Sequence, residues 1–130
     1  MELTVGIKGH DEVVVDMSNV ASAVGSGALD VFSTPSMIAC MERAALSSVM
    51  PYMDEGFSTV GIGLDVQHLA ATPLGETVRT ESELVEIVKN RFLTFDIKSY
   101  CGEQLVGTCI HKRCVVDINK FMEKAGLSAK

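Results

Sequence analysis

Residues 33–50 carry the clearest periodic pattern of apolar and polar positions in the chain. Their apolar side chains recur every three or four positions, as expected for a helix with one buried face. Thr34 before Pro35 is typical of a helix start with Thr34 as the N-cap, and Pro51 predicts the end of the helix. We therefore predict one apolar helix in the first half of the chain.

The second half of the chain is dominated by extended patterns with a period of two, interrupted by Gly and Pro at turn-like intervals. Residues 18–30, rich in Gly, Ser and Ala, are typical of a mobile connection or a loosely wound lid. One helix followed by antiparallel strands predicts an α+β fold in a single domain, residues 1–130, with a sheet able to curl around the helix. The predicted strands cover residues 58–71, 77–89, 91–100 and 104–118, with a further strand or hairpin in 2–16 and a short helix at 119–126.

Glu42 is the unexpected residue on the predicted helix. At 100° per residue it falls near the middle of an apolar arc that includes Ile38, Met41, Ala45 and Val49. A carboxylate in that position is costly unless it is hydrogen-bonded, paired or neutralised. Glu42 therefore either reaches solvent or a backbone amide at the end of the core, or it is placed there as an acid, a base or an orienting group.

His68 raises the same question on the strand 58–71. Alternation puts the even-numbered residues from Val60 to His68 on one apolar face, which the histidine ends. A histidine there is either a satisfied core or edge residue or a catalytic base. If the helix and the strand pack through these two faces, Glu42 and His68 converge, and a carboxylate fixes the tautomer of the imidazole and raises its basicity.

Thr34 also has two interpretations. It caps the helix, or its hydroxyl takes part in chemistry beside the N–H groups of Ser36 and Met37, which would stabilise an oxyanion. A straight helix separates Thr34 from Glu42 by about 12 Å along the axis. Contact between the two would require the preceding chain to fold back, or the helix to begin later than Pro35.

Composition excludes several classes of function. The formal net charge of -6 argues against a nucleic-acid partner, and no apolar run approaches the roughly 20 residues that cross a bilayer. The first residues lack the layout of a secretory signal, and the four cysteines show neither a C-x-x-C pair nor a metal-site spacing. We expect a cytoplasmic protein with reduced thiols, no metal, and no nucleic-acid or membrane partner.

The order of these residues and motifs resembles the fluoroacetyl-CoA thioesterase family of hotdog-fold proteins. The resemblance covers about residues 31–122 and rests on ME in the helix, HLAATPLG after the first long strand and HKR in the last strand. It implies a hotdog fold, in which an antiparallel sheet wraps around one long central helix. It further implies hydrolysis of an acyl-CoA to CoA and free acid by a homodimer, or a dimer of dimers, with active sites at the subunit interface. The CoA belongs to the substrate, so no separate cofactor is implied.

The resemblance also assigns roles to residues. The catalytic set falls on Thr34, Glu42 and His68, and residues associated with substrate handling fall on Gly61 and Arg113.

The family's fluoroacetyl-selective member closes its acyl pocket with an aromatic lid. Residues 22–32 of this chain supply only Phe32, which we therefore include among the substrate-binding residues. This difference from the family's aromatic lid argues against selectivity for fluorine, but hydrolysis of a short-chain acyl-CoA stays the expected activity.

The expected mechanism is acyl transfer to water. His68 acts as general base, Glu42 orients it, and Thr34 either attacks the thioester carbonyl or positions the attacking water. In a further variant, Glu42 itself is the base or nucleophile. Amides at the helix start or the backbone near Gly61 would hold the oxyanion.

The CoA phosphates need cations, for which Lys89, Arg91, Lys98 and Lys112 are candidates, although each is also a plausible solvated surface charge. Three other readings stay open at this point: a non-catalytic module that binds acyl-CoA or another small ligand, an interaction subunit that buries the helix against a partner, and hydratase chemistry on the same scaffold.

Overall fold

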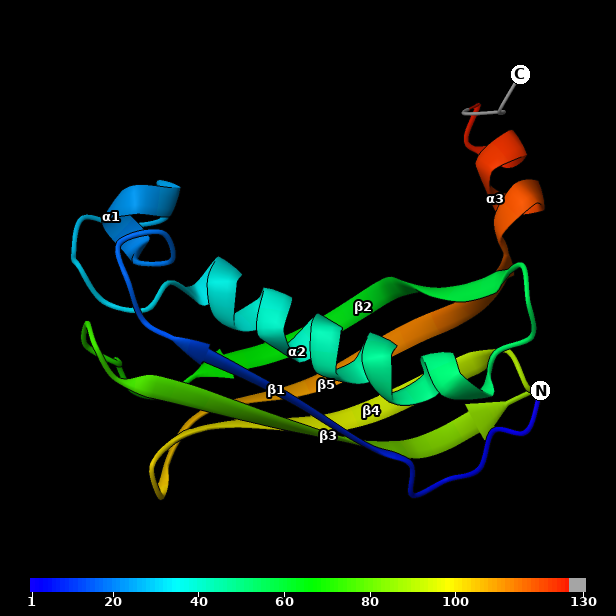
Figure 1. The fold of residues 1–130 in the computed structure, drawn as a ribbon, viewed down its shortest axis with the longest axis horizontal. Coiled ribbons are helices and arrows are strands. Elements are labelled where there is room, and N and C mark those ends of the chain that lie inside the picture. The colour runs from blue at the N-terminus through cyan, green and yellow to red at the C-terminus, as the bar shows by residue number, and fades with distance from the viewer. Residues whose placement is uncertain (127–130) are drawn as a thin grey trace.

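A computed structural model describes residues 1–126, so the last four positions of the predicted domain 1–130 lie outside the described residues. The elements are β1 (Lys8–Val14), α1 (Ala21–Val24), α2 (Thr34–Val49), the 3₁₀ turn η1 (Met50–Tyr52), β2 (Phe57–His68), β3 (Thr77–Val88), β4 (Phe92–Cys101), β5 (Gln104–Asp117) and α3 (Ile118–Lys124). The strands form one antiparallel sheet in the order β1-β3-β4-β5-β2, and α2 lies along it (Figure 1). The predicted α+β class, with a sheet curled around a single long helix, is confirmed.

The helix α2 begins one residue earlier than its sequence predicts. Ser33 is the N-cap: its hydroxyl accepts a hydrogen bond from the Ser36 N–H at 3.1 Å, and its carbonyl accepts one from the Met37 N–H at 3.0 Å. Thr34 is therefore the first helical residue and not the cap. Its hydroxyl is released from the capping role that would otherwise occupy it.

The buried face of α2 is rotated about the helix axis by roughly a quarter turn from the predicted apolar arc, counting 100° per residue. It includes small residues, because β1 crosses the helix at close range: a side chain added at Gly9 would collide with the Ala44 carbonyl and approach the Ser48 side chain to 2.8 Å. Glu42 therefore lies at the margin of the buried face and not in its middle. The buried residues of α2 are Met37, Cys40, Met41, Ala44, Ala45, Ser48 and Val49.

A β-bulge interrupts β2. The register with β5 shifts between Gly61 and Gly63, which leaves Ile62 as the extra residue. The bulge reverses the alternation, so that odd-numbered residues up to Gly61 face α2 before it and even-numbered residues from Leu64 to His68 face α2 after it. The predicted common face of β2 is therefore wrong for the even-numbered residues before the bulge.

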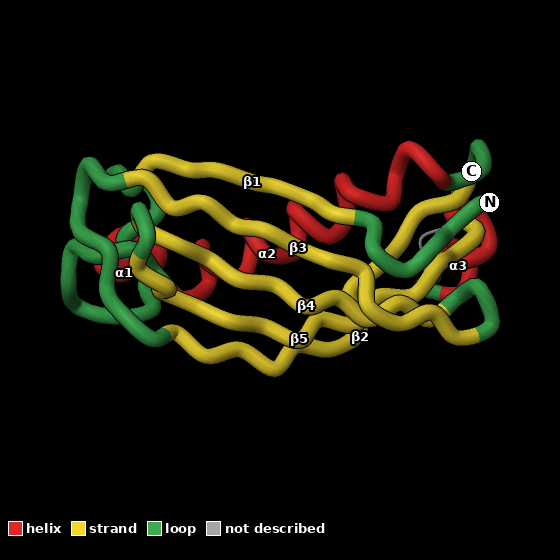
Figure 2. The backbone as a smooth tube through the Cα atoms, turned by 90° about the horizontal axis from the view of Figure 1, so that it is seen from below, coloured by secondary structure: helices red, strands yellow, loops and turns green. Residues whose placement is uncertain are grey.

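The two edges of the sheet are β1 and β2, as Figure 2 shows from below. The segment 18–30, predicted as a connection or lid, contains the single turn α1 and lies beyond the N-terminal end of α2 (Figure 1). None of the helices in residues 1–126 combines the length and the apolar character needed to cross a membrane. The fully buried large side chains of the core include Phe32, Met37, Met41, Leu84, Leu93, Phe95 and Ile97.

Candidate active site

Thr34 and His68 meet at one end of the molecule. Thr34 occupies the first turn of α2 and His68 ends β2, and the Thr34 hydroxyl lies 2.7 Å from the His68 Nδ1. The ladder pairs His68 with Gly107, where a side chain would collide with Met37 of α2. This glycine lets the helix start approach the sheet closely, which brings the hydroxyl and the imidazole together.

The imidazole of His68 is held in a state suited to accept a proton. Burial lowers its pKa from the ordinary value, and the backbone of Ala70 opposes that shift only in part. The ring is therefore neutral at neutral pH. Its Nε2 is shielded from solvent and has no hydrogen-bond partner among residues 1–126. One ring nitrogen of His68 thus faces a hydroxyl, while the other is buried and unpaired within the described residues.

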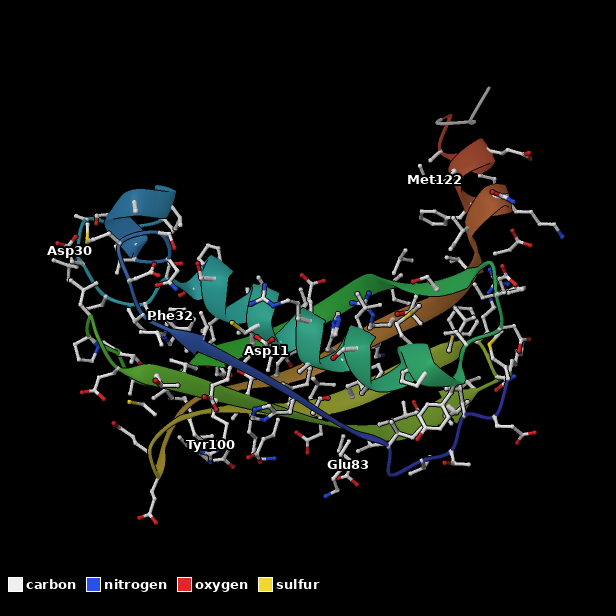
Figure 3. The ribbon with its side chains drawn as sticks, viewed as in Figure 1. Asp11, Asp30, Phe32, Glu83, Tyr100 and Met122 are labelled. Atoms are coloured by element: carbon white, nitrogen blue, oxygen red, sulfur yellow. The ribbon has the colours of Figure 1, made fainter. Side chains whose placement is uncertain are left out.

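A cavity of about 370 Å³ opens beside this pair. Phe32, Thr34 and His68 line it together with residues of α1 and of the segment after β2. Phe32 is almost fully buried, pairs through its backbone with Val20, and lies near the start of α2 in Figure 3. Phe32 therefore forms a fixed wall of the cavity, consistent with the expected role in substrate binding, which stays a prediction.

Glu42, in the middle of α2, and Arg113, on β5, form a second cluster. The Glu42 Oε2 lies 3.7 Å from the Arg113 Nη1, and the side chain of Glu42 is 41% exposed whereas that of Arg113 is 6% exposed. Arg113 also donates from Nε to the Thr59 hydroxyl at 2.8 Å and from Nη2 to the Thr59 carbonyl at 2.9 Å. Burial lowers the pKa of Arg113, with the Glu42 carboxylate opposing the shift. The guanidinium is thus fixed on one side and presents one edge to Glu42.

His111 belongs to this cluster, although the sequence did not single it out. It is fully buried, and its Nε2 lies 3.0 Å from the Arg113 Nη1. Because a guanidinium only donates, Nε2 must accept this bond, so Nδ1 carries the proton and donates to the Gly63 carbonyl at 2.9 Å. Burial lowers the pKa of His111, which keeps this tautomer neutral. His111 therefore links the guanidinium to the bulge of β2.

Gly61 lies at the centre of the cluster. A Cβ built on it would be 2.7 Å from the Glu42 Oε2, 3.2 Å from the His111 Cε1 and 3.5 Å from the Arg113 Nη1. Glycine at this position leaves room for the Glu42 carboxylate, which lies directly over the backbone of β2. The backbone of Gly61 is consequently open to a ligand only on the side that Glu42 leaves free.

The structure therefore brings the predicted residues together in two groups within one chain. Thr34, His68 and Phe32 lie at the start of α2, and Glu42, Arg113 and Gly61 lie two turns further along it. No contact between Glu42 and His68 occurs within one chain among the described residues. The amides of Ser36 and Met37 already donate to Ser33, which removes them from the predicted oxyanion donors.

The sequence placed His111 on the same strand face as Arg113 but indicated no role for it. His111 and Arg113 are two positions apart on a strand and so point to the same face. Only the arginine received a role, because nothing in the pattern indicated that the histidine would contact the backbone of β2. Among residues 1–126, no group of three or more His, Cys, Asp or Glu side chains is placed to hold a metal ion.

Comparisons with known proteins point to one family. A family model described as fluoroacetyl-CoA-specific thioesterase matches residues 15–119. The fluoroacetyl-CoA thioesterase of Streptantibioticus cattleyicolor is 35% identical over 95 residues, which are 73% of this chain and 68% of that protein.

Solved structures agree with this result. A variant of the fluoroacetyl-CoA-specific thioesterase in complex with fluoroacetate and CoA is 29% identical and superposes with a TM-score of 0.85, over 92% of this chain and 99% of that one. A thioesterase superfamily member from Thermus thermophilus, 20% identical, has a TM-score of 0.88 over 96% of this chain and 92% of that one, and this likeness supports the hotdog fold alone.

Proposed function

Since the chain belongs to the fluoroacetyl-CoA-specific thioesterase family, we propose that it hydrolyses an acyl-CoA thioester to CoA and the free acid. The observation that carries the proposal is the 2.7 Å approach of the Thr34 hydroxyl to the neutral His68 imidazole. Both side chains line the same cavity, so a thioester bound there would meet a hydroxyl with a proton acceptor beside it. A module that only binds acyl-CoA would not need this pair.

Two routes use the pair. In the first, the Thr34 oxygen attacks the thioester carbonyl as its proton passes to His68; the C–S bond breaks, the proton goes to the CoA sulfur, and water then cleaves the acyl-threonine ester. In the second, the pair activates a water that attacks the carbonyl directly. Both routes use only side chains of the protein, with no metal or cofactor besides the CoA carried by the substrate. An acyl-protein mass after brief mixing with substrate would identify the first route.

The active protein is proposed to be a homodimer joined through the β2 edges. Within residues 1–126, β2 pairs only with β5, so its outer edge presents free backbone groups. Ile62 and Leu64 on this strand are 54% and 45% exposed. An apolar open edge of this kind is a template for pairing with a second strand, and a twofold axis would pair two copies of β2 antiparallel.

This pairing would complete the site. An antiparallel β2–β2 register centred between Leu64 and Asp65 places His68 opposite Gly61 of the partner subunit. Because Glu42 lies over Gly61 in each chain, the partner's Glu42 would come next to the His68 Nε2, the nitrogen that has no partner within the described chain. Glu42 would then orient the imidazole and stabilise its protonated form.

The oxyanion donors are proposed at the bulge of the partner subunit. The N–H groups of Ser36 and Met37 are engaged by Ser33, whereas Ile62 has no ladder partner in β5. Arg113, fixed by Thr59 and His111, would hold Glu42 in place and add positive charge beside the acyl group.

We further propose a short-chain acyl group without selectivity for fluorine, since Phe32 is the only aromatic residue between α1 and α2. A cytoplasmic location is proposed because Cys40, Cys101, Cys109 and Cys114 are all free thiols.

The test is a complementation experiment with two inactive chains. Thiol release from acetyl-CoA and other short acyl-CoAs is measured for wild type, Glu42→Ala, His68→Ala and a co-expressed mixture of the two variants. Each variant alone should be inactive, whereas the mixed dimers contain one intact site, which restores about a quarter of wild-type activity for random pairing. No recovery in the mixture, with mixed dimers present by native mass spectrometry, would refute the shared site. A wild type that binds CoA but releases no thiol from any acyl-CoA would refute the hydrolase.

A further inference from the structure

A second cavity, of about 440 Å³, lies at the α3 end of the molecule. It is bounded by α3, by the start of β2 with the end of β5, and by the turn between β3 and β4. Figure 1 places α3 at the opposite end of the molecule from α1, which borders the cavity beside Thr34 and His68. The volume of the second cavity lies within the range of small-molecule sites.

Buried side chains separate this cavity from the proposed reaction centre. Phe57, Thr59 and Gly61 share the inner face of β2, because they precede the bulge. Thr59 is 4% exposed, and Arg113 donates to its hydroxyl at 2.8 Å and to its carbonyl at 2.9 Å. This packed pair fills the inner face between Phe57, which lines the cavity, and Gly61, which lies beside Glu42. The cavity is therefore a compartment of its own and not an extension of the reaction centre.

Apolar side chains form the inner part of the cavity. Val115 is 8% exposed and Phe57 is half-buried against the core, whereas Phe121 of α3 remains 40% exposed. An aromatic ring that borders a cavity and is still open to water gains free energy when an apolar group covers it. The cavity therefore favours a ligand with an apolar body.

Exposed cations line the same cavity. They are Arg91, Lys120 and Lys124, and none of them forms an ion pair with another residue in 1–126. The acidic residue in the lining is Asp117, whose carboxylate accepts a hydrogen bond from the Lys120 N–H at 3.1 Å and caps α3. In a chain with a formal net charge of -6, three cations beside one carboxylate are a local reversal of sign. The cavity therefore favours an anion.

Arg91 is the cation whose position is best fixed. Its carbonyl accepts a hydrogen bond from the Val115 N–H at 2.8 Å, and its guanidinium carbon lies 5.4 Å from the centre of the Phe92 ring. A planar guanidinium binds a carboxylate through two parallel hydrogen bonds. We propose that the cavity binds an aliphatic carboxylic acid of medium chain length in its ionised form. The carboxylate would lie at Arg91 and Lys120, and the chain would cover Val115 and Phe121.

This class of ligand follows from the two properties of the lining together. A short acid such as acetate would leave the ring of Phe121 uncovered, and a neutral lipid would leave the three cations without a counter-charge. An unbranched carboxylate of medium length satisfies both. Binding here is independent of thioester hydrolysis, because Thr59 and Arg113 close the inner face of β2 between the two compartments.

Two of the cations predicted for CoA phosphates lie elsewhere. Lys98 pairs with Asp96 at 3.3 Å, and Lys112 is exposed between the inward-facing His111 and Arg113, so it points to the outer face of the sheet. Lys112 therefore offers a matched control, since its charge can be reversed without altering the cavity.

The experiment measures the binding of hexanoate, octanoate and decanoate to the full chain by calorimetry at neutral pH. Each CH₂ that enters the apolar part of the cavity should tighten binding about fourfold. Acetate should show no measurable binding. 1-Octanol, which has the same chain length as octanoate but no charge, should bind about tenfold more weakly than octanoate.

Variants of the lining assign the site. Arg91→Gln and Lys120→Glu should each weaken octanoate binding about tenfold, whereas Lys112→Glu should leave it unchanged. Phe121→Ser should reduce the gain in affinity for each added CH₂ and leave the preference for octanoate over 1-octanol. Thermal melting identifies any variant that has lost its fold, and Lys120→Gln, which removes one charge without adding another, should still weaken octanoate binding.

Three results would overturn the site. The first is octanoate that binds wild type no more tightly than acetate does. The second is an equal loss of octanoate affinity in Lys120→Glu and Lys112→Glu, which would indicate a general effect of charge. The third is octanoate that is displaced by saturating CoA and binds Phe121→Ser as tightly as wild type, because the acid would then lie in the reaction centre.

Discussion

His111→Leu tests the buried network that holds the middle of α2 to the bulge of β2. The histidine is fully buried, accepts from Arg113 and donates to the Gly63 carbonyl. Leucine keeps most of the volume but removes the hydrogen bonds that His111 makes to the Arg113 Nη1 and to the Gly63 carbonyl. Each buried group left unsatisfied costs about 1–3 kcal/mol, so we expect the free energy of unfolding to fall by about 2–6 kcal/mol. For a domain of ordinary stability this is a large fraction of the total.

Two conservative variants separate the contributions of the two His111 hydrogen bonds to stability. Glutamine at position 111 can place an acceptor where Nε2 lies, and asparagine can place a donor where Nδ1 lies, so each should lose about 1–3 kcal/mol and retain one bond. The matched control is His10→Leu, because the His10 side chain is 57% exposed on β1. That change should stay within about 0.5 kcal/mol.

The assay is urea unfolding at pH 7.5, followed by circular dichroism, with slopes compared to confirm that the unfolded states are equivalent. The reasoning is refuted if His111→Leu is as stable as wild type, or if the Leu, Gln and Asn variants all lose the same amount. Equal losses would mean that shape, and not the two hydrogen bonds, determines the contribution of the side chain.

Two further predictions concern the same sites. Gly61→Ala would place a methyl group 2.7 Å from the Glu42 Oε2 and displace the carboxylate. The kcat/KM for acetyl-CoA should therefore fall about tenfold or more, while the melting temperature changes little. Unchanged kinetics would contradict the placement of Glu42. His68 and His111 both have pKa values lowered by burial, so the unfolded chain binds more protons than the folded one below about pH 6.5. Stability should therefore be full above that pH and decline as the pH falls, with a shallower decline in His111→Gln; urea midpoints that do not change between pH 7.5 and 5.5 would contradict this.

The elements of the fold were largely predictable because each is encoded by its own periodicity. The helix at 33–50 and the strands at 77–89, 91–100 and 104–118 match α2, β3, β4 and β5 to within a few residues. The face of α2 was not predictable from hydropathy, because the close approach of β1 at Gly9 selects small residues for the contact. The apolar pattern of a helix identifies its hydrophobic side chains, whereas a close approach between two elements requires small side chains at the contact.

The sequence singled out residues that the structure groups in two places, but it did not predict this arrangement, and the roles of these residues stay predictions. Thr34 and His68 do lie within hydrogen-bond distance, despite the separation in sequence. The bulge at Gly61–Gly63 could not be placed from the sequence, since glycines in a strand indicate a bulge without fixing which residue is extra. His111 was missed because its role depends on a backbone carbonyl of another strand, which carries no sequence signature.

The division of the six predicted site residues between two places on the chain has a consequence for dilution. A lone protomer would carry the hydroxyl and the imidazole at one end and the carboxylate two helical turns away, so no single copy would contain a working centre. Activity per milligram should then decline as the protein is diluted below the dissociation constant of the proposed dimer. A bound thioester that touches both copies would oppose that decline by mass action.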